Sequence, residues 1–266
     1  MAGAMAMTPV HTWLGALLAC LFVLPARACD GAPAPDSAAA VDAPDLQGIA
    51  VYLPKVLESS DSGPFADLLK VVGRHYPAGR IRFSIEPVKR VYLDTSDKSV
   101  DFRFPIMKIR EGADRGTPFQ FSHEMLGKVS FVIYSNKEKP FGKADLLRMA
   151  TLPKYEVAIH APPASWDFPA SRVINLELSL KQLNLGRIDA VIWAQEDADY
   201  LVRKDGLGHI HREHLDDYPD VLFFSCNKRG DFVNQAMSAA IRAARDSGEL
   251  QKAYAKVHQP YQDWQP

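Results

Sequence analysis

Residues 176–193 read LELSLKQLNLGRIDAVIW and predict two elements in direct succession. Leu176 to Leu185 is predicted to be a helix that ends at Gly186, because glycine readily adopts the left-handed conformation that closes helices. The apolar run from Ile188 to Trp193 predicts a buried strand. A helix that leads directly into a buried strand is typical of an α/β protein.

The same alternation continues through the rest of the chain. Further strands are predicted at 48–53, 81–85, 100–104, 129–134, 156–159 and 221–225, and further helices at 63–72, 88–95, 143–149 and 231–257. In the helix over 63–72, Phe65, Leu68, Leu69 and Val72 share one face, and Gly248 is the predicted break in the last segment. Alternating strands and helices imply parallel sheets that helices cover on both faces.

The composition is that of a folded, nearly neutral protein. The chain has 266 residues, 31 Lys+Arg and 32 Asp+Glu, so its formal net charge is −1, and 47% of its residues are hydrophobic. This balance excludes wholesale disorder and argues against a nucleic-acid-binding surface spread over the whole protein. A local basic cleft stays compatible with it.

The first 28 residues resemble a secretory signal peptide. The apolar run from Trp13 to Leu24 is too short to cross a bilayer, and Ala26-Arg27-Ala28 supplies an A-x-A cleavage site. The segment before this run contains no Lys or Arg, which departs from the pattern and leaves a short buried helix as the alternative. Cys20 weakly resembles a lipoprotein cleavage position, but apolar residues continue beyond it. We therefore expect cleavage after residue 28 and a periplasmic protein without a lipid anchor.

Two cysteines remain after the predicted cleavage. Residues 29–45 are mostly Ala, Pro and Asp without periodicity, which predicts a flexible leader. An oxidising compartment permits a disulfide between Cys29 and Cys226. Cys226 ends an apolar run that starts at Val221, and this position favours a buried free thiol instead.

Five spaced motifs resemble one known family. They are Gly63-Pro-Phe-Ala-Asp67-Leu-Leu after the first strand, Pro87-x-x-Arg90 followed by Val100-Asp101, Arg115 with Phe121-Ser122, Gly186-Arg-Ile-Asp189-Ala-Val-Ile, and the closing segment Asn234 to Val257. In this order they resemble the amino-acid-type substrate-binding proteins of bacterial ABC importers, and the chain looks like a divergent member. The resemblance covers roughly residues 46–258, and no single motif is specific.

The resemblance implies a two-lobed type II periplasmic-binding-protein fold. Lobe one would comprise residues 46–125 and 222–266, and lobe two residues 126–221. Two chain crossings, near 126–129 and 219–222, would form the hinge. The ligand would bind in the interlobe cleft, where strand ends leave a crevice and helix N-termini favour anions.

The resemblance also implies site residues in lobe one. One motif consists of Arg115 with Phe121-Ser122. In the family, the arginine of this motif pairs with the ligand's α-carboxylate, which points to Arg115, and Ser122 belongs to the same motif. Arg90 is a second candidate anion contact or a helix-surface charge. Arg103, beside Phe104, is a candidate cleft contact or a surface charge on a strand. A guanidinium fork suits a planar carboxylate in each case.

Further candidates flank the predicted cleft. Tyr52 ends the first strand, where an aromatic residue commonly walls the ligand site in the family, although an ordinary half-buried tyrosine fits as well. Trp193 and Gln195 end the strand that begins at Ile188. The loop 160–166 (HAPPASW) departs from the family because its two prolines remove backbone N–H donors. Ser165 in this loop is a candidate ligand contact or a helix cap.

One expected carboxylate is missing. In the amino-acid binders an aspartate about five residues after the G-x-x-D aspartate holds the ligand's ammonium, and counting from Asp189 gives Ala194. Glu196 or Asp197 substitutes if the loop shifts. The departure weakens an α-amino-acid ligand and suits a carboxylate without an adjacent ammonium, or an aromatic ligand stacked on Trp193.

Three functions compete. The leading one is a monomeric periplasmic receptor that captures a small anionic, carboxylate-bearing or amino-acid-like ligand for an ABC-type permease, by hinge closure, without a cofactor, a catalytic residue or a nucleic-acid partner. The second is a lyase of the cyclohexadienyl dehydratase type, with His123, Glu124 or Glu196 as acid or base. The third is a sensor or accessory protein with a protein partner.

A histidine cluster also needs an interpretation. His209-x-His211-x-x-His214 places two histidines on one face if the segment is a strand, which is a geometry for metal binding. An exposed loop between Gly206 and Asp217 is the alternative, and we expect no metal site because no cysteine or well-placed carboxylate accompanies the cluster.

Overall fold

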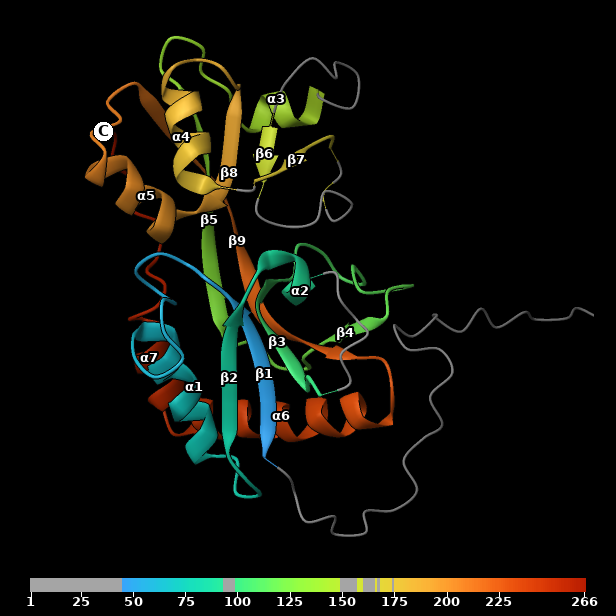
Figure 1. Ribbon diagram of the computed structural model, residues 1–266. Coiled ribbons are helices and arrows are strands. Elements are labelled where there is room, and N and C mark those ends of the chain that lie inside the picture. Colours follow the sequence, from blue (N-terminus) through green and yellow to red (C-terminus); the bar gives the residue numbers. More distant parts are fainter. Residues whose placement is uncertain (1–44, 93–98, 149–156, 160–165, 167, 174) are drawn as a thin grey trace, which may run out of the picture.

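The computed structural model describes residues 45–266 except 93–98, 149–156, 160–165, 167 and 174 (Figure 1). The predicted signal peptide and nearly all of the predicted leader therefore lie outside the described residues. The same holds for Cys20, Cys29 and Ser165. In the part that is described, no helix is both long and apolar enough to cross a membrane.

The described part of the chain contains strands and helices in alternation. The strands are β1 (Leu46–Val51), β2 (Ile81–Glu86), β3 (Phe102–Met107), β4 (Phe119–Phe121), β5 (Gly127–Asn136), β6 (Val157–Ile159), β7 (Ser171–Arg172), β8 (Ala190–Ala194) and β9 (Ile210–Ser225). The helices are α1 (Pro64–Arg74), α2 (Val88–Tyr92), α3 (Lys143–Arg148), α4 (Leu176–Asn184), α5 (Gln195–Lys204), α6 (Lys228–Asp246) and α7 (Glu249–Tyr254). The predicted α/β class is confirmed.

All these strands belong to one mixed sheet. Its order is β2-β1-β3-β9-β5-β8-β6-β7, with β4 paired to β9 outside this path. The outer pairs β1–β2, β1–β3, β6–β8 and β6–β7 are parallel, as predicted. The pairs made by β9 with β3, β4 and β5, and the β5–β8 pair, are antiparallel, which corrects the prediction of purely parallel sheets. The pairs made by β9 are antiparallel because this strand returns the chain from one end of the molecule to the other.

β9 is much longer than the sequence predicted. The prediction was a strand at 221–225 after an exposed loop, but the strand begins at Ile210 and runs to Ser225. Its first half (HREHLDD) is too polar to read as a buried strand. It is a strand because β5 supplies a ladder of backbone partners from Asn136 to Gly127, opposite Ile210 to Asp220. His211 and His214 therefore lie on a strand.

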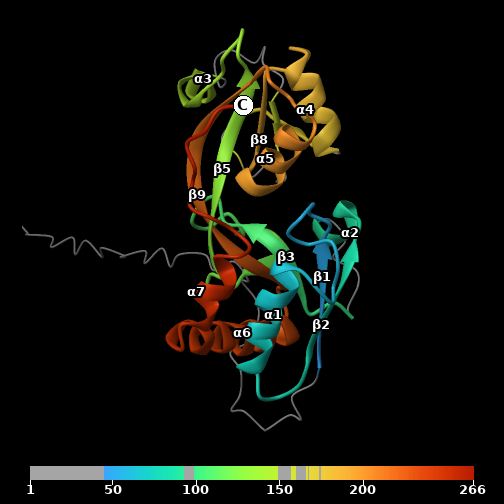
Figure 2. The ribbon, with the colours of Figure 1, turned by 90° about the vertical axis from the view of Figure 1, so that its left-hand side faces the viewer.

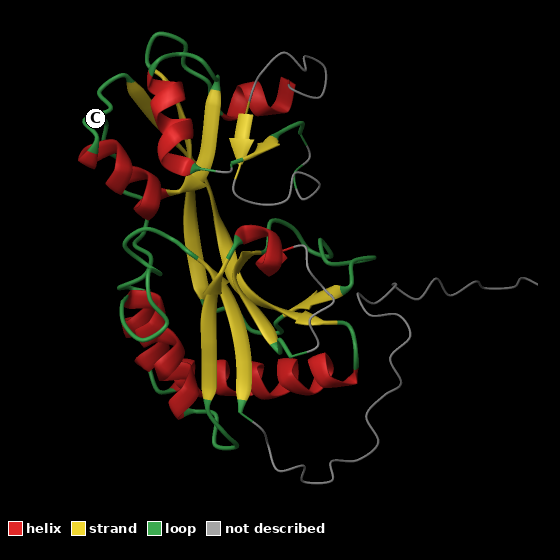
Figure 3. Ribbon diagram, viewed as in Figure 1, coloured by secondary structure: helices red, strands yellow, loops and turns green. Residues whose placement is uncertain are grey.

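The molecule has two lobes joined by β5 and β9 (Figures 1 and 2). One lobe contains β1 to β4 with α1, α2, α6 and α7, and the other contains β6 to β8 with α3, α4 and α5. Both lobes combine strands with covering helices, as the secondary-structure view shows (Figure 3). The C-terminal part of β9 pairs with β3 and β4, and its N-terminal part pairs with β5. The residue at which each lobe begins stays a prediction.

Local sequence signals account for several elements. α1 buries Phe65, Leu68, Leu69 and Val72, the face that the sequence predicted. Gly186 follows α4 with φ of 66° and donates its N–H to Leu183 at 2.9 Å, as expected for a glycine that ends a helix. Gly248, with φ of 75°, separates α6 from α7. A side chain at either glycine would strain a left-handed backbone.

Cys226 differs from the prediction. It lies directly after β9, half-buried, and is disulfide-bonded. The preference for a free buried thiol was therefore wrong. The apolar run that suggested burial belongs to β9, and Cys226 lies just beyond its end, where its side chain is no longer enclosed by the sheet.

A fully buried arginine joins β9 to the end of the chain. Arg212 is 0% exposed, and its guanidinium bonds the carboxylate of Asp199 on α5 twice, at 2.7 Å each. The Asp199 carboxylate also accepts hydrogen bonds from Tyr134 at 2.7 Å and from Trp264 at 2.9 Å. The remaining guanidinium nitrogen donates to the carbonyls of Gln262 and Trp264. All the partners of this charge are therefore protein groups.

The C-terminal segment (residues 258–266) thus reaches the second lobe. It starts after α7 in the first lobe and ends beside α5, near the label C in Figure 1. Gln195 donates to the carbonyls of Gln259 and Pro260, and Gln265 exchanges two hydrogen bonds with the backbone of Arg212. The segment is a third connection between the lobes, beside β5 and β9.

We predict that Arg212→Met destabilises the protein by about 3–5 kcal/mol, because it leaves the Asp199 carboxylate buried without its cation. Urea unfolding measures this loss. The matched control is Arg74→Met, which removes an exposed pair with Glu249 and is expected to lower the stability far less, because solvent screens exposed ion pairs. Adding Asp199→Asn to Arg212→Met is expected to cost less than the sum of the two single changes. Equal losses for Arg212→Met and Arg74→Met contradict the structural role of the buried pair.

Candidate functional site

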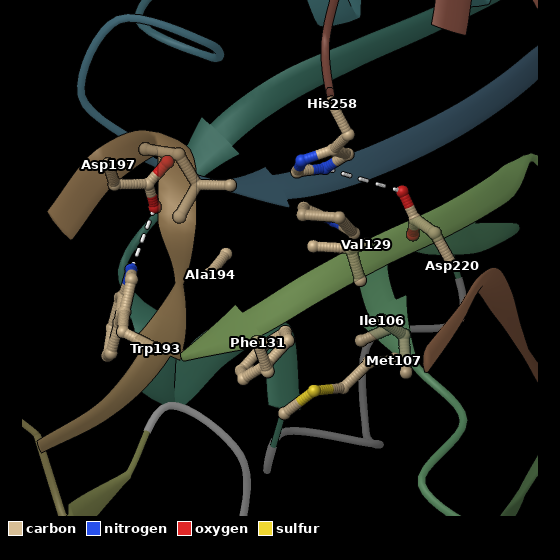
Figure 4. A pocket seen from close by; sticks show the side chains of 11 residues that line it. Ile106, Met107, Val129, Phe131, Trp193, Ala194, Asp197, Asp220 and His258 are labelled. Atoms are coloured by element: carbon tan, nitrogen blue, oxygen red, sulfur yellow. Dashed lines mark hydrogen bonds and ion pairs between the residues drawn. The ribbon is translucent and has the colours of Figure 1, made fainter. Parts of the chain in front are cut away.

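A pocket lies where the two lobes meet. It is small, with a cavity of about 30 Å³, and its wall is mainly apolar (Figure 4). The lining residues are Leu53, Pro105, Ile106, Met107, Val129, Phe131, Trp193, Ala194, Asp197, Asp220 and His258. We call it the interlobe pocket. At this volume it has room for little more than one or two water molecules.

The topology explains the position of the interlobe pocket. Leu53 follows β1, Met107 ends β3 and Ala194 ends β8, so three strands deliver their carboxyl ends to it from both lobes. α5 begins immediately after β8, with Ala194 as its N-cap and no side chain capping its N-terminus. Strand carboxyl ends that meet a helix N-terminus at a change of sheet direction form the usual ligand crevice of α/β folds.

Asp197 is the pocket's buried carboxylate from the second lobe. One of its oxygens, Oδ2, accepts a hydrogen bond from the Trp193 indole at 2.8 Å (Figure 4). The other oxygen, Oδ1, is buried and has no hydrogen-bond partner among the described residues. Burial raises the pKa of Asp197 to about 7, although the hydrogen bond from Trp193 opposes this rise. Oδ1 of Asp197 is therefore an acceptor at the pocket wall that no described residue uses.

A second acidic group faces it across the pocket. Asp220 on β9 is 2% exposed, and burial raises its pKa to about 7 against the opposing effects of His258 and Tyr254. The Nε2 atom of His258 lies 3.9 Å from Asp220, and its Nδ1 atom lies 2.9 Å from Glu196 on α5. Burial alone would lower the pKa of His258, but Glu196 and Asp220 together hold it above its ordinary value.

The predicted site residues lie in different surroundings. Trp193 lines the interlobe pocket. Tyr52 is 56% exposed and donates a hydrogen bond to Glu58 at 3.3 Å. Arg90 is exposed and pairs with Glu86, one turn earlier, at 3.2 Å. Arg115 is exposed on a turn between β3 and β4, outside the lining of the pocket. Of these four residues, the structure brings only Trp193 to the pocket.

Four further candidates are buried within the protein. Arg103 is 0% exposed, with its guanidinium 4.9 Å from the centre of the Phe119 ring. Phe104 packs against other aromatic rings in the core. Ser122 donates to the carbonyl of Glu124 and accepts from the backbone of β9, so its hydroxyl holds two segments together. Gln195 contacts the C-terminal segment, as described above. Ser165 lies outside the described residues.

Sequence reasoning missed the groups that the sheet and the chain end bring together. Asp220 lies in a polar stretch without a motif, and His258 follows the last helix, so neither carries a signal of its own. Glu196 and Asp197 were considered as substitutes for the missing aspartate, and the structure separates them. Glu196 is bonded to His258 and to the backbone of Gln259, whereas Asp197 lines the pocket.

The histidine cluster forms no metal centre among the residues with described positions. There, no group of three or more His, Cys, Asp or Glu side chains is placed to hold a metal ion. His214 pairs with Asp217 at 3.0 Å and stacks on Tyr261, with ring centres 4.6 Å apart. On β9, His214 therefore contacts a residue of its own strand and the C-terminal segment.

The architecture is similar to several solved structures. A histidine kinase sensor domain with similarity to periplasmic binding proteins matches with a TM-score of 0.61 and 13% identity, over 80% of this chain and 95% of that one. The GluR0 ligand-binding core from Nostoc punctiforme, in complex with L-glutamate, matches with a TM-score of 0.58 and 16% identity, over 81% and 100%. The arginine-, lysine-, histidine-binding protein ArtJ from Geobacillus stearothermophilus matches with a TM-score of 0.58 and 14% identity, over 82% and 97%.

Sequence comparison adds nothing to this similarity. No protein-family model matches the chain, and no curated protein matches it significantly. Identities of 13% to 16% show the fold alone. The protein has the two-lobed type II periplasmic-binding-protein fold, with a hinge and an interlobe cleft, and this prediction is confirmed.

We predict that Asp197→Asn changes how stability depends on pH. The pKa of Asp197 is about 7 in the folded protein and about 4 in the unfolded chain. The unmodified protein therefore loses stability as pH rises from about 4 through about 7, because the unfolded chain gives up this proton first. The variant lacks this loss. Its melting temperature, relative to the unmodified protein, is expected to increase by several degrees between pH 4 and pH 8.

The control is Asp61→Asn, which changes an exposed carboxylate. Its melting temperature should follow the unmodified protein at every pH. A constant difference between Asp197→Asn and the unmodified protein across this range contradicts a raised pKa at Asp197.

Proposed function

We propose that the protein binds a small solute in the interlobe pocket and that the lobes close on it by bending at β5 and β9. One observation carries this proposal. The carboxyl ends of β1, β3 and β8 and the N-terminus of α5 meet at a single pocket whose walls come from both lobes. Contacts made only when the lobes are together would shift the hinge towards its closed state.

The lining suggests the chemistry of the solute. Met107, Phe131 and Trp193 offer apolar surface, and Asp197 Oδ1 offers an acceptor that has no described partner. These groups fit a small carboxylate-bearing or amino-acid-like solute, with its apolar part against Met107 and a hydrogen-bond donor on Asp197. Because the cavity is only about 30 Å³, such a solute enters only when the lobes move apart.

Arg115 stays in the proposal as the anchor for the solute's carboxylate. Its side chain is exposed and forms no ion pair with any residue whose position is described. A guanidinium in this state is available to a carboxylate. It lies outside the pocket lining, so its part in binding needs a test of its own.

The step after binding separates two uses of the same pocket. In the first, a periplasmic receptor delivers the solute to an ABC-type permease. In the second, closure signals to a protein partner, a role that the similarity to a histidine kinase sensor domain favours. Both uses place the protein in the periplasm, as the predicted signal peptide requires.

A lyase on the same fold is the second candidate. It is favoured by Asp197 and Asp220, two buried carboxylates at one pocket whose pKa values are both about 7. Groups that titrate near neutral pH are suited to general acid–base catalysis. Conversion of a bound solute, followed by mass spectrometry, distinguishes this activity from binding alone.

We predict that a thermal-shift panel of amino acids, keto acids, dicarboxylic acids and aromatic acids gives a stabilising ligand. At about 100 times its Kd such a ligand adds about 2.7 kcal/mol, which raises the melting temperature by a few degrees. Met107→Trp, which fills the interlobe pocket, should abolish the shift. Its matched control is Met125→Trp, at an exposed methionine outside the pocket. Arg115→Ala should weaken binding of carboxylates.

The outcomes of this panel test the pocket, the role of Arg115 and solute binding itself. A shift that Met107→Trp abolishes and Met125→Trp preserves supports the pocket. A shift that both variants preserve moves the site elsewhere, and one that Arg115→Ala leaves unchanged removes Arg115 from it. Silence from folded, ligand-free protein contradicts solute binding.

A further inference from the structure

A second, larger hollow lies beside α5. It is a groove of about 460 Å³ between α5 of the second lobe, the loop after β1 in the first lobe, and the C-terminal segment. Its wall includes Lys55, Tyr200, Arg203, Lys204, Gln259 and Gln262. We call it the α5 groove. α5 contributes to both hollows, but the α5 groove shares no lining residue with the interlobe pocket, so it is a separate space.

Three cations face the α5 groove. Lys55 comes from the first lobe, whereas Arg203 and Lys204 come from the last turn of α5 in the second. All three side chains are exposed, and none of them forms an ion pair with a residue whose position the structure describes. Arg203 is held in the wall by Trp264, because its guanidinium lies 4.0 Å from the centre of the ring.

The acidic groups of the groove are already used. Glu196 pairs with His258 at 2.9 Å, and Asp199 pairs with Arg212 at 2.7 Å. Each of these carboxylates is thus balanced by its own cation. Glu58 lies near Lys55 but does not line the groove, and its carboxylate accepts from the Lys55 backbone at 2.9 Å and from Tyr52. Among the residues that line the groove, the three cations therefore face no carboxylate that lacks its own cation.

The backbone at Lys55 is held in an uncommon conformation. Its φ is 70°, and Lys55 is the single non-glycine residue with positive φ in the described part of the chain. Such a conformation costs free energy and is maintained by surrounding contacts, here the hydrogen bond to Glu58. It keeps the loop after β1 at the edge of the groove.

We infer that the α5 groove binds a small multivalent oxyanion, such as a phosphate or a di- or tricarboxylate, between Lys55 of one lobe and Arg203 and Lys204 of the other. The guanidinium of Arg203 offers two parallel donors to such a group, and the lysines act as point charges. Since the cations belong to different lobes, the anion stabilises the arrangement of the lobes in which all three converge. The site is independent of the solute proposed for the interlobe pocket.

The test is a titration with inorganic phosphate and, separately, with citrate, at constant ionic strength. Heat release and the fluorescence of tryptophan are both followed, because Trp264 contacts Arg203 directly. Saturable binding of at least one anion is expected, and comparing the two titrations shows whether phosphate or carboxylate is preferred. Lys55→Gln combined with Arg203→Gln should weaken binding about tenfold or more, the loss of at least one charge-assisted hydrogen bond.

The control removes the same two charges elsewhere. Lys252→Gln combined with Lys256→Gln changes two exposed lysines, on and just after α7, that do not line the α5 groove. It should leave the affinity unchanged, and thermal unfolding of both double variants shows that they are folded. Equal weakening by both double variants overturns the site, because only overall charge then matters. No saturable binding of either anion by the unmodified protein overturns it as well.

Discussion

The two-lobed structure depends on where the charge of Arg212 is placed. A guanidinium that is 0% exposed is tolerated only if its donors are satisfied. Asp199 satisfies two of them from α5, and carbonyls of the C-terminal segment satisfy the third nitrogen. In the folded protein, three parts of the chain must therefore come together. They are Arg212 on β9, helix α5, and the C-terminal segment.

This requirement has a consequence for the hinge. The C-terminal segment leaves α7 in the first lobe and is fixed to the second lobe by Arg212 and Gln195. On its way it places His258 against Glu196 and Asp220 at the wall of the interlobe pocket. Any movement of one lobe against the other must bend β5 and β9 and also move this segment. Hinge motion, pocket electrostatics and the end of the chain are thus coupled through a few residues.

The candidate site could be predicted only in part. Trp193 was found because the buried strand that it ends is legible in the sequence, and the carboxyl end of such a strand points into an α/β crevice. Asp197 was among the residues considered, but its place in the pocket depends on α5, which begins at Gln195. The same helix directs Glu196 towards His258 and not into the pocket. Asp220 and His258 are 38 residues apart along the chain, and no spacing rule joins them. Arg103 reads as a cleft contact or a surface charge, yet β9 pairs with its strand and Phe119 of β4 lies against its guanidinium.

The sequence by itself determined the local elements, because their signals are local. Apolar spacing placed the buried face of α1, and glycines marked the ends of α4 and α6. Only the tertiary structure decided that HREHLDD is part of a strand, since its partners on β5 lie 76 to 87 residues away along the chain. It also decided which charges are buried in pairs and which stay free. Those outcomes depend on the proximity of distant segments, which residue patterns along one stretch of chain do not specify.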